Sequence, residues 1–255
     1  MSELTILGIF VADISFSGDK IPITGETILG DSYNIGPGGK GCNQAIAISR
    51  LGGKVNFISK LGKDNYGKLA IDKLKKDNID TSNIIKRSKI FLTQLEIPLD
   101  VTFHCLKLAK ENGLINILNP APACELNNDF FKLVDYFTPN ETEAEFYTGI
   151  KINDERDAKN SAEKLLSMGI KKVIITLGEK GLFYSDGNED IFIRASSVKT
   201  IDTTGAGDAF NGGFSFALLK GKKIKECLEL ANKVAGLSTT KLGAGDSMPF
   251  LKDLN

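Results

Sequence analysis

The stretch DTTGAGDAFNGGF, residues 202–214, places four glycines and two aspartates at and around the predicted start of a long helix. Small residues at 205–207 leave backbone N–H groups open at the positive end of the helix dipole, where a phosphoryl group in transfer is stabilised. Asp208 lies in the first turn, where a carboxylate is also common simply because it stabilises a helix N-terminus. Further glycines at 212 and 213, where a helix favours alanine, indicate close approach of a ligand or of another backbone segment.

A second glycine cluster, GPGGKGCN at residues 36–43, opens directly into another predicted helix. It matches the dinucleotide-binding pattern G-x-G-x-x-G, but it follows a Pro/Gly-broken excursion of about twenty residues instead of the first strand. It is not a Walker A loop either, because Gly41 stands where Ser or Thr is required. What remains is a backbone that a small polar ligand can approach, with Lys40 and Asn43 as donors, or a plain glycine-rich turn that caps a helix.

Between and around these clusters, apolar runs alternate with amphipathic stretches, which is typical of βαβ units and a parallel sheet covered on both faces. We predict strands over 4–10, 55–61, 90–96, 114–118, 135–138 and 172–176, and a hairpin of 182–185 with 191–194. Helices are predicted over 40–51, 66–77, 101–111, 141–148, 155–168, 206–219 and 224–239. The fold class is therefore α/β, with three layers around a mainly parallel sheet and one domain over residues 1–255.

Composition excludes several classes of function. Lys plus Arg and Asp plus Glu both number 32, so the net charge is zero and no nucleic-acid partner is expected. The apolar run 4–12 has no basic segment before it and meets Asp13, so it is neither a signal peptide nor a membrane span. The sequence has one histidine and four cysteines without a C-x-x-C pair, which argues against zinc and Cys/His chemistry and favours a cytoplasmic location.

Both glycine clusters, in this order, resemble the two signature segments of the ribokinase-like (PfkB) family of sugar and nucleoside kinases. Further stretches are similar to its ribokinase branch: PITGET at 22–27, TQLE at 93–96, NPAP at 119–122, TPNETEAE at 138–145, ITLG at 175–178 and GAGDS at 243–247. Together they span nearly the whole chain. The resemblance implies an ATP-dependent kinase that phosphorylates a primary hydroxyl of a pentose, foremost D-ribose, with Mg²⁺ and an activating K⁺.

The resemblance also implies roles for single residues. Asp208 would be the catalytic base that accepts the proton of the attacking hydroxyl, and the N–H groups of Gly205, Ala206 and Gly207 would form the anion hole for the migrating phosphoryl. Asn140 and Glu143 match the family's Asn-x-x-Glu motif, which acts on Mg²⁺ and phosphate through water. A solvated helix charge is the alternative interpretation of Glu143.

Three further groups of residues match the family's binding positions. The nucleotide positions are Asn140, Thr176, Gly178, Gly181 and Asn232. The sugar positions are Asp13, Gly38, Gly39, Lys40, Asn43 and Glu96, and carboxylates suit them because each accepts hydrogen bonds from vicinal hydroxyls. The monovalent-cation positions, mostly backbone carbonyls, are Asp202, Thr204, Ser238, Lys241, Gly243 and Ser247.

Two departures from the family bear on activity. Val11 stands where ribokinases usually have a sugar-binding asparagine, and between Ser88 and Ile90 the chain omits several tens of residues that in relatives form two further lid strands, a return segment and a helix. A two-stranded remnant lid over 14–36 predicts weaker sugar binding, slower transfer or none, and makes a lid-mediated homodimer doubtful.

Three hypotheses stand at this point. The first is the sugar kinase. The second is a relative, with little or no turnover, that binds nucleotide or sugar, or a kinase for another sugar or a nucleoside. The third is a nicotinamide-dependent oxidoreductase, which rests on the Gly36–Gly41 pattern alone.

Overall fold

The computed structural model describes residues 3–81 and 88–254, and its centre is a twisted sheet with the strand order β10-β9-β8-β7-β6-β5-β1-β4. The six neighbouring strands β4, β1, β5, β6, β7 and β8 are parallel. At the other edge of the sheet, β9 pairs antiparallel with β8, and β10 pairs antiparallel with β9. Their bounds are β1 Leu4–Leu7, β4 Val55–Ile58, β5 Ile90–Thr93, β6 Ile115–Leu118, β7 Tyr136–Phe137, β8 Val173–Thr176, β9 Leu182–Ser185 and β10 Asp190–Ile193. The expected mainly parallel sheet is confirmed.

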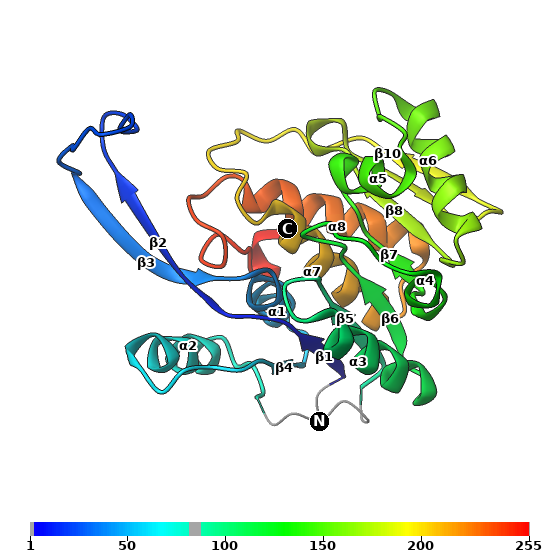
Figure 1. Ribbon diagram of the computed structural model, residues 1–255, viewed down its shortest axis with the longest axis horizontal. Coiled ribbons are helices and arrows are strands. Elements are labelled where there is room, and N and C mark those ends of the chain that lie inside the picture. The colour runs from blue at the N-terminus through cyan, green and yellow to red at the C-terminus, as the bar shows by residue number, and fades with distance from the viewer. Residues whose placement is uncertain (1–2, 82–87, 255) are drawn as a thin grey trace.

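Helices cover both faces of this sheet (Figure 1). One face carries α1 (Lys40–Arg50), α7 (Ala206–Leu219) and α8 (Ile224–Ser238), and the other carries α3 (Leu99–Glu111), α4 (Asn128–Leu133), α5 (Glu141–Thr148) and α6 (Glu155–Ser167). Successive strand residues serve opposite layers: Ile174 packs with the α7 side and Ile175 with the α6 side. Strands that are buried on both faces read as continuous apolar runs, which is how the sequence presents them.

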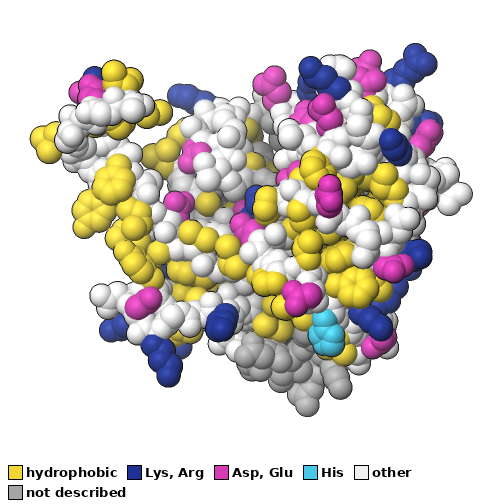
Figure 2. Space-filling model, in the orientation of Figure 1, with side chains coloured by type: hydrophobic (Ala, Val, Ile, Leu, Met, Phe, Trp, Pro, Cys, Tyr) yellow, Lys and Arg dark blue, Asp and Glu magenta, His cyan; other side chains and the backbone are white. Residues whose placement is uncertain are grey.

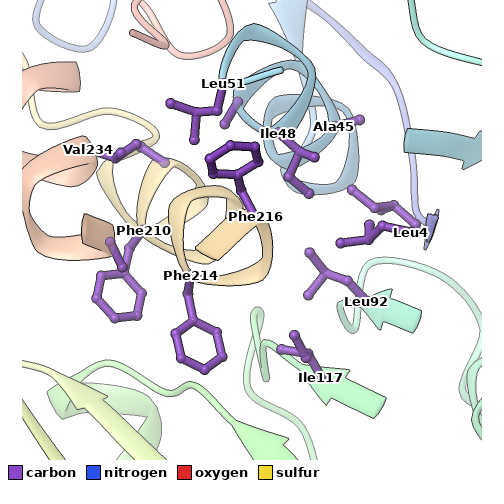
Figure 3. Packing of buried hydrophobic residues seen from close by; sticks show 14 of the residues in the cluster. Leu4, Ala45, Ile48, Leu51, Leu92, Ile117, Phe210, Phe214, Phe216 and Val234 are labelled. Atoms are coloured by element: carbon purple, nitrogen blue, oxygen red, sulfur yellow. The ribbon is translucent and has the colours of Figure 1, made fainter. Parts of the chain in front are cut away.

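The core between sheet and helices is organised around α7. Phe210, Phe214 and Phe216 extend from α7 among residues of α1, α8 and the strands (Figure 3). A Cβ added at Gly212 would lie 2.5 Å from the Cβ of Ala47, so this glycine is required by the close approach of α7 and α1. The glycines at 212 and 213 therefore serve helix packing, which was one of the two interpretations of this stretch.

A two-stranded antiparallel ribbon of β2 (Val11–Ser17) and β3 (Ser32–Gly38) projects from the α/β body (Figure 1). Its cross-strand pairs Ile14–Ile35 and Phe16–Tyr33 share one face, and Asp13 stands on the opposite face. Hydrophobic side chains are gathered along the ribbon (Figure 2), and Phe16 is 76% exposed. We call β2, β3 and their connection the lid. Helix α2 (Asn65–Lys76) lies at the β4 edge, on the lid side of the molecule.

Among the described residues, three short elements were not predicted: α4 and the 3₁₀ turns Gly178–Lys180 and Leu251–Leu254. Their lengths, six, three and four residues, are too short for a helical period to register. Within residues 3–81 and 88–254, no helix has the length and apolar character needed to cross a membrane.

Candidate active site

One cavity lies where the carboxyl ends of β6, β7 and β8 meet the N-termini of α1 and α7, the position at which open α/β sheets bind their ligands. Eight of the residues singled out from the sequence line it: Lys40, Asn140, Glu143, Thr176, Gly205, Ala206, Gly207 and Asp208. Five that were not singled out line it as well: Asn119, Ala121, Thr138, Thr203 and Asn211.

Asp208 is the buried carboxylate of this cavity, with 5% of its surface exposed. Its Oδ2 accepts a hydrogen bond from Asn43 Nδ2 at 2.9 Å, and its Oδ1 accepts one from Gln44 Nε2 at 3.1 Å. Burial raises the pKa of Asp208 to about 6, against the opposing effects of the two amide donors and of Lys40. The group is thus a carboxylate at neutral pH with a pKa close to that of an efficient general base.

A network of amide side chains fixes the orientation of Asp208. Gln44 is fully buried and accepts a hydrogen bond from Gln94 Nε2, while its own Nε2 also reaches Asn119 Oδ1 at 3.3 Å. Asn119 continues the network to the carbonyl of Thr138. Gln44 and Gln94 were not among the predicted site residues. The sequence did contain a signal for Gln44: it is a polar side chain within residues 41–48 of α1, which are buried and mostly apolar or small. A buried polar side chain needs hydrogen-bond partners and so indicates a network.

The start of α7 offers the expected anion-binding donors, with one difference. Gly205 has φ +77°, and α7 begins at Ala206. Within the described residues, the N–H groups of Gly205, Gly207 and Asp208 have no hydrogen-bond acceptor, whereas Ala206 N–H donates to Thr203 O at 3.1 Å. The turn over 203–206 therefore uses the Ala206 donor, and the open donors are its neighbours Gly205 and Gly207 together with Asp208. They lie at the positive end of the helix dipole.

The proposed sugar positions gather where the lid joins α1. Lys40 N donates to Glu96 Oε2 at 2.9 Å, which links the helix start to the segment after β5. Gly39 has φ +86°, and a Cβ there would lie 2.6 Å from Ile9 O, so only glycine fits. Asp13 lies beside Gly38, whose added Cβ would be 3.0 Å from the Asp13 Cβ.

Two oxygen atoms near the proposed sugar positions have no hydrogen-bond partner among the described residues. Burial raises the pKa of Glu96, against the Lys40 N–H bond, and its Oε1 has no hydrogen-bond partner within the described ranges. Asn43 Oδ1 is likewise buried without a partner there. A ligand hydroxyl could donate to Glu96 Oε1, whereas Asn43 Oδ1 faces the backbone of Gly245.

Asn140 and Glu143 form a capping box at the start of α5: Asn140 Oδ1 accepts from Glu143 N at 2.8 Å, and Glu143 Oε2 accepts from Asn140 N at 2.9 Å. Burial raises the pKa of Glu143, and its capping role at the start of α5 is compatible with either interpretation of this residue. The described residues contain no cluster of three or more metal-ligating side chains. Magnesium nevertheless fits this place, because it keeps most of its waters and needs only one or two protein carboxylates.

The remaining predicted residues lie outside the lining of this cavity. Gly178 is the first residue of the 3₁₀ turn after β8 and Gly181 follows its last residue; a Cβ at Gly181 would lie 1.9 Å from Ile193 O, so the close approach of β10 already requires this glycine. Asn232 on α8 donates through Nδ2 to Arg194 O at 2.7 Å, which attaches α8 to the segment after β10.

The proposed cation positions lie behind the start of α7. Asp202 Oδ1 accepts from Thr204 N and its Oδ2 from Gly243 N, both at 2.9 Å. Bonds from Thr204, followed by that of Gly243, lower the Asp202 pKa. The hydroxyls of Ser238 and Ser247 are buried. These oxygens fit a weakly hydrated monovalent cation such as K⁺. Lys241 contributes no side chain here, because its Nζ lies 3.9 Å from Asp253 Oδ2.

Known proteins match the chain over nearly its whole length. The model of the pfkB family carbohydrate kinases matches residues 1–90 and 83–251. The ribokinase of Haemophilus influenzae is 38% identical, covering 96% of this chain and 95% of the relative, and that of Staphylococcus aureus is 33% identical, covering 100% and 99%. Among solved structures, the Arabidopsis thaliana ribokinase complexed with ribose and ATP gives a TM-score of 0.93 at 27% identity, covering 100% of this chain and 98% of that one.

The comparisons also indicate that relatives contain a segment that this chain lacks. The Haemophilus alignment runs over 290 residues but includes 96% of the 255 residues here, so about 45 positions of the relative face no residue of this chain. The two matches to the family model overlap at residues 83–90, where we expected this chain to lack residues of its relatives, between Ser88 and Ile90. The third hypothesis fails on position: Gly36 and Gly38 belong to the lid strand β3, not to the turn after β1 that a dinucleotide fold requires.

Proposed function

Because the chain belongs to the pfkB family of carbohydrate kinases, we propose that it transfers the γ-phosphate of ATP to the primary hydroxyl of D-ribose, giving D-ribose 5-phosphate. The observation that carries this proposal is the buried Asp208 beside the open N–H groups at the start of α7. A base and an anion hole on the same helical turn are what phosphoryl transfer to a hydroxyl requires.

In the proposed mechanism, Asn43 and Gln44 hold the Asp208 carboxylate so that it accepts the proton of the attacking hydroxyl. The hydroxyl oxygen forms a bond to the γ-phosphorus as the bond to the β-phosphate oxygen breaks, and ADP leaves. The open N–H groups of Gly205 and Gly207 donate to the phosphoryl oxygens in the transition state, and the Lys40 ammonium contributes positive charge on the same side of the cavity.

The proposed sugar contacts are Asp13, Glu96, Lys40, Asn43 and the backbone of Gly38 and Gly39. Glu96 and Asp13 would accept hydrogen bonds from ribose hydroxyls. The adenine end of ATP is assigned to the turn with Gly178 and Gly181, which follows Thr176, and to Asn232 on α8. Magnesium bound with ATP neutralises the phosphate oxygens. Glu143 and Asn140 would hold it through water, and the oxygens around Asp202 and Ser247 would hold K⁺.

The second candidate, a relative that binds nucleotide or sugar with little or no turnover, is favoured by the lid alone. Only β2 and β3 are present in the described lid, and Val11 offers no hydrogen bond to a sugar hydroxyl. An incomplete cover admits water and weakens the assembly of the site around the sugar. We therefore expect a kinase with a raised KM for ribose.

A coupled assay of ADP release over a panel of pentoses, hexoses and nucleosides tests the proposal, with Asp208→Asn as the control. Ribose-dependent ADP release that the substitution abolishes is the expected result. Measurable ATP binding without release on any sugar would refute the kinase and leave the second candidate. Preference for another sugar or a nucleoside would keep the kinase and change its substrate.

We also propose that the protein forms a homodimer and lies in the cytoplasm. The apolar face of the lid, with Phe16 and Tyr33 exposed, supports a homodimer through the lid, and sedimentation at several concentrations would test it. The four cysteines are free thiols, which supports a reducing, cytoplasmic location.

A further inference from the structure

The loop over residues 243–248 packs against the start of α7 from behind. Gly243 N donates to Asp202 Oδ2 at 2.9 Å. A Cβ added at Gly205 would lie 3.2 Å from Ala244 Cα and 3.3 Å from Met248 Cε. The loop has no helix or strand of its own. The position of the 243–248 loop therefore limits where the backbone at the start of α7, with its open N–H groups, can lie.

The same loop touches the residue that holds Asp208 and the base of the lid. An added Cβ at Gly245 would lie 3.0 Å from Asn43 Oδ1 and 2.9 Å from Pro37 Cγ. Asp246 Oδ2 lies 3.1 Å from the position of a Cβ on Gly36. One irregular segment thus contacts the anion hole, the amide beside the proposed base, and β3.

The side chain of Arg50, the last residue of α1, anchors this loop. Its Nη1 donates to Gly245 O and Asp246 O, both at 3.1 Å, and to Met248 O at 2.9 Å. On its other edge, Nε and Nη2 meet the two oxygens of Asp77 at 2.9 and 3.5 Å. The side chains of Arg50 and Asp77 are only 11% and 9% exposed.

Only arginine can make these bonds together. The guanidinium is a rigid planar fork with five donors, so it can face a carboxylate on one edge and carbonyl oxygens on the other, while a lysine ammonium is a point donor on a flexible stem. The guanidinium also lies 4.9 Å from the centre of the Phe250 ring, which limits its rotation. Asp77 balances the charge, so the loop gains hydrogen bonds without an uncompensated buried cation.

We propose that Arg50 is a positioning residue for phosphoryl transfer: by holding the carbonyls of Gly245, Asp246 and Met248, it fixes the 243–248 loop against Gly205 and Asn43 and so sets the geometry of the anion hole. This inference rests on the proposed kinase function. Arg50 itself contacts neither substrate, because it lies at the far end of α1 from Lys40, about 15 Å along the helix axis.

The effect should fall on turnover more than on sugar binding. In Arg50→Lys, we expect kcat to fall about 10- to 100-fold, because displacements near 1 Å have effects of this size. The KM for ribose should change less than kcat, because among the proposed sugar side chains the loop approaches Asn43 but neither of the carboxylates Asp13 and Glu96. The K⁺ concentration for half-maximal activity should rise, since Gly243 and Ser247 belong to the same loop.

The test combines kinetics with hydrogen exchange by mass spectrometry on the full-length protein without ligands. Exchange should accelerate in peptides covering both 243–248 and 203–210 in Arg50→Lys and Arg50→Met. The matched control is Lys110→Met, which removes another half-buried ion pair, Lys110 with Asp135 at 2.7 Å, beside the amino end of β7 and away from the cavity. The control should lose stability without changing exchange in either peptide, kcat or the K⁺ requirement.

Three outcomes would overturn the proposal. The first is a loop that exchanges faster while 203–210 does not, because the loop would then not carry the effect to the anion hole. The second is a Tm loss like that of the control with unchanged kcat and K⁺ requirement, which would leave Arg50 a purely structural residue. The third is unchanged exchange throughout. Hydrogen exchange needs no turnover. A failed kinase assay alone would therefore refute the proposed function, while the exchange rates of 203–210 would still test whether Arg50 positions the start of α7.

Discussion

Replacing Asp208 by asparagine is expected to slow kinase activity by orders of magnitude and, at neutral pH, to make the protein more stable. Burial raises the pKa of Asp208 from 3.8 to about 6. Because the folded state holds this proton more tightly than the unfolded state, the penalty for the buried charge is absent below about pH 4 and complete above pH 6. A shift of about two pKa units corresponds to about 3 kcal/mol at pH 7.5, and about half of that remains at pH 5.

The neutral amide removes the buried charge and can still form hydrogen bonds with both Asn43 and Gln44. Asn43 Oδ1 has no partner within the described residues, so rotating the Asn43 amide by half a turn gives it an acceptor that faces the NH₂ group of the substituted side chain. Gln44 Nε2 can keep its bond to the new carbonyl oxygen. We therefore expect a gain of about 2–3 kcal/mol at pH 7.5, which raises the Tm by roughly 5–10 °C for a chain of this size.

Thermal unfolding of wild type and Asp208→Asn between pH 4 and pH 8 measures this difference. The two melting curves should converge as the pH falls toward 4, where Asp208 is protonated in the folded state and only a small part of the penalty remains. An asparagine variant that is no more stable at pH 7.5, or whose advantage does not shrink with falling pH, would refute the argument from burial. ADP release by the same variant should be about 10²- to 10⁴-fold slower, the range for loss of a general base.

Four further outcomes are expected. Gly39→Ala should lower the Tm, since its left-handed φ alone costs about 1–2 kcal/mol and its Cβ would meet a backbone oxygen at 2.6 Å; an unchanged Tm would contradict this. Glu96→Gln should raise the KM for ribose about 10-fold or more with a smaller change in kcat, because a hydrogen bond to a charged group is worth about 1.5–3 kcal/mol; equal KM values would remove Glu96 from the sugar site. Gln44→Met removes a donor that lowers the Asp208 pKa, so the acid limb of the kcat/KM profile should move to higher pH, and a fixed limb would show that Gln44 does not tune the base. Turnover with K⁺ should exceed turnover with Na⁺ or tetramethylammonium as the only monovalent cation, and equal rates would exclude the cation site around Asp202.

The fold could be predicted from the sequence because its strands are buried on both faces and its helices are amphipathic or begin at glycine-rich segments. Runs such as 172–176 and 182–185 are apolar throughout most of their length, as strands between two helical layers must be. The short elements could not be predicted because they are too short to show a helical period. Helix α4 is six residues long and is stabilised by its Asn127 cap, not by a periodic apolar face.

The candidate site was predictable where single residues carry the chemistry and not where a network does. Asp208 and the glycines before it stand in one motif. Gln44 and Gln94 lie fifty residues apart, and their role follows from hydrogen bonds across the α1–β5 contact. The use of the Ala206 N–H by Thr203 O is a property of the turn's geometry, which residue types alone do not determine.

The close contact of Gly212 with Ala47 leaves no room for α7 to slide on α1. The two helices that carry Asp208 and its amide donors thus form one incompressible block, whose interior would change only at the expense of packing. The lid shares no core with that block. The length of the lid can therefore change without repacking this block, and the positions of Asp208 and its amide donors do not depend on how many residues the lid contains.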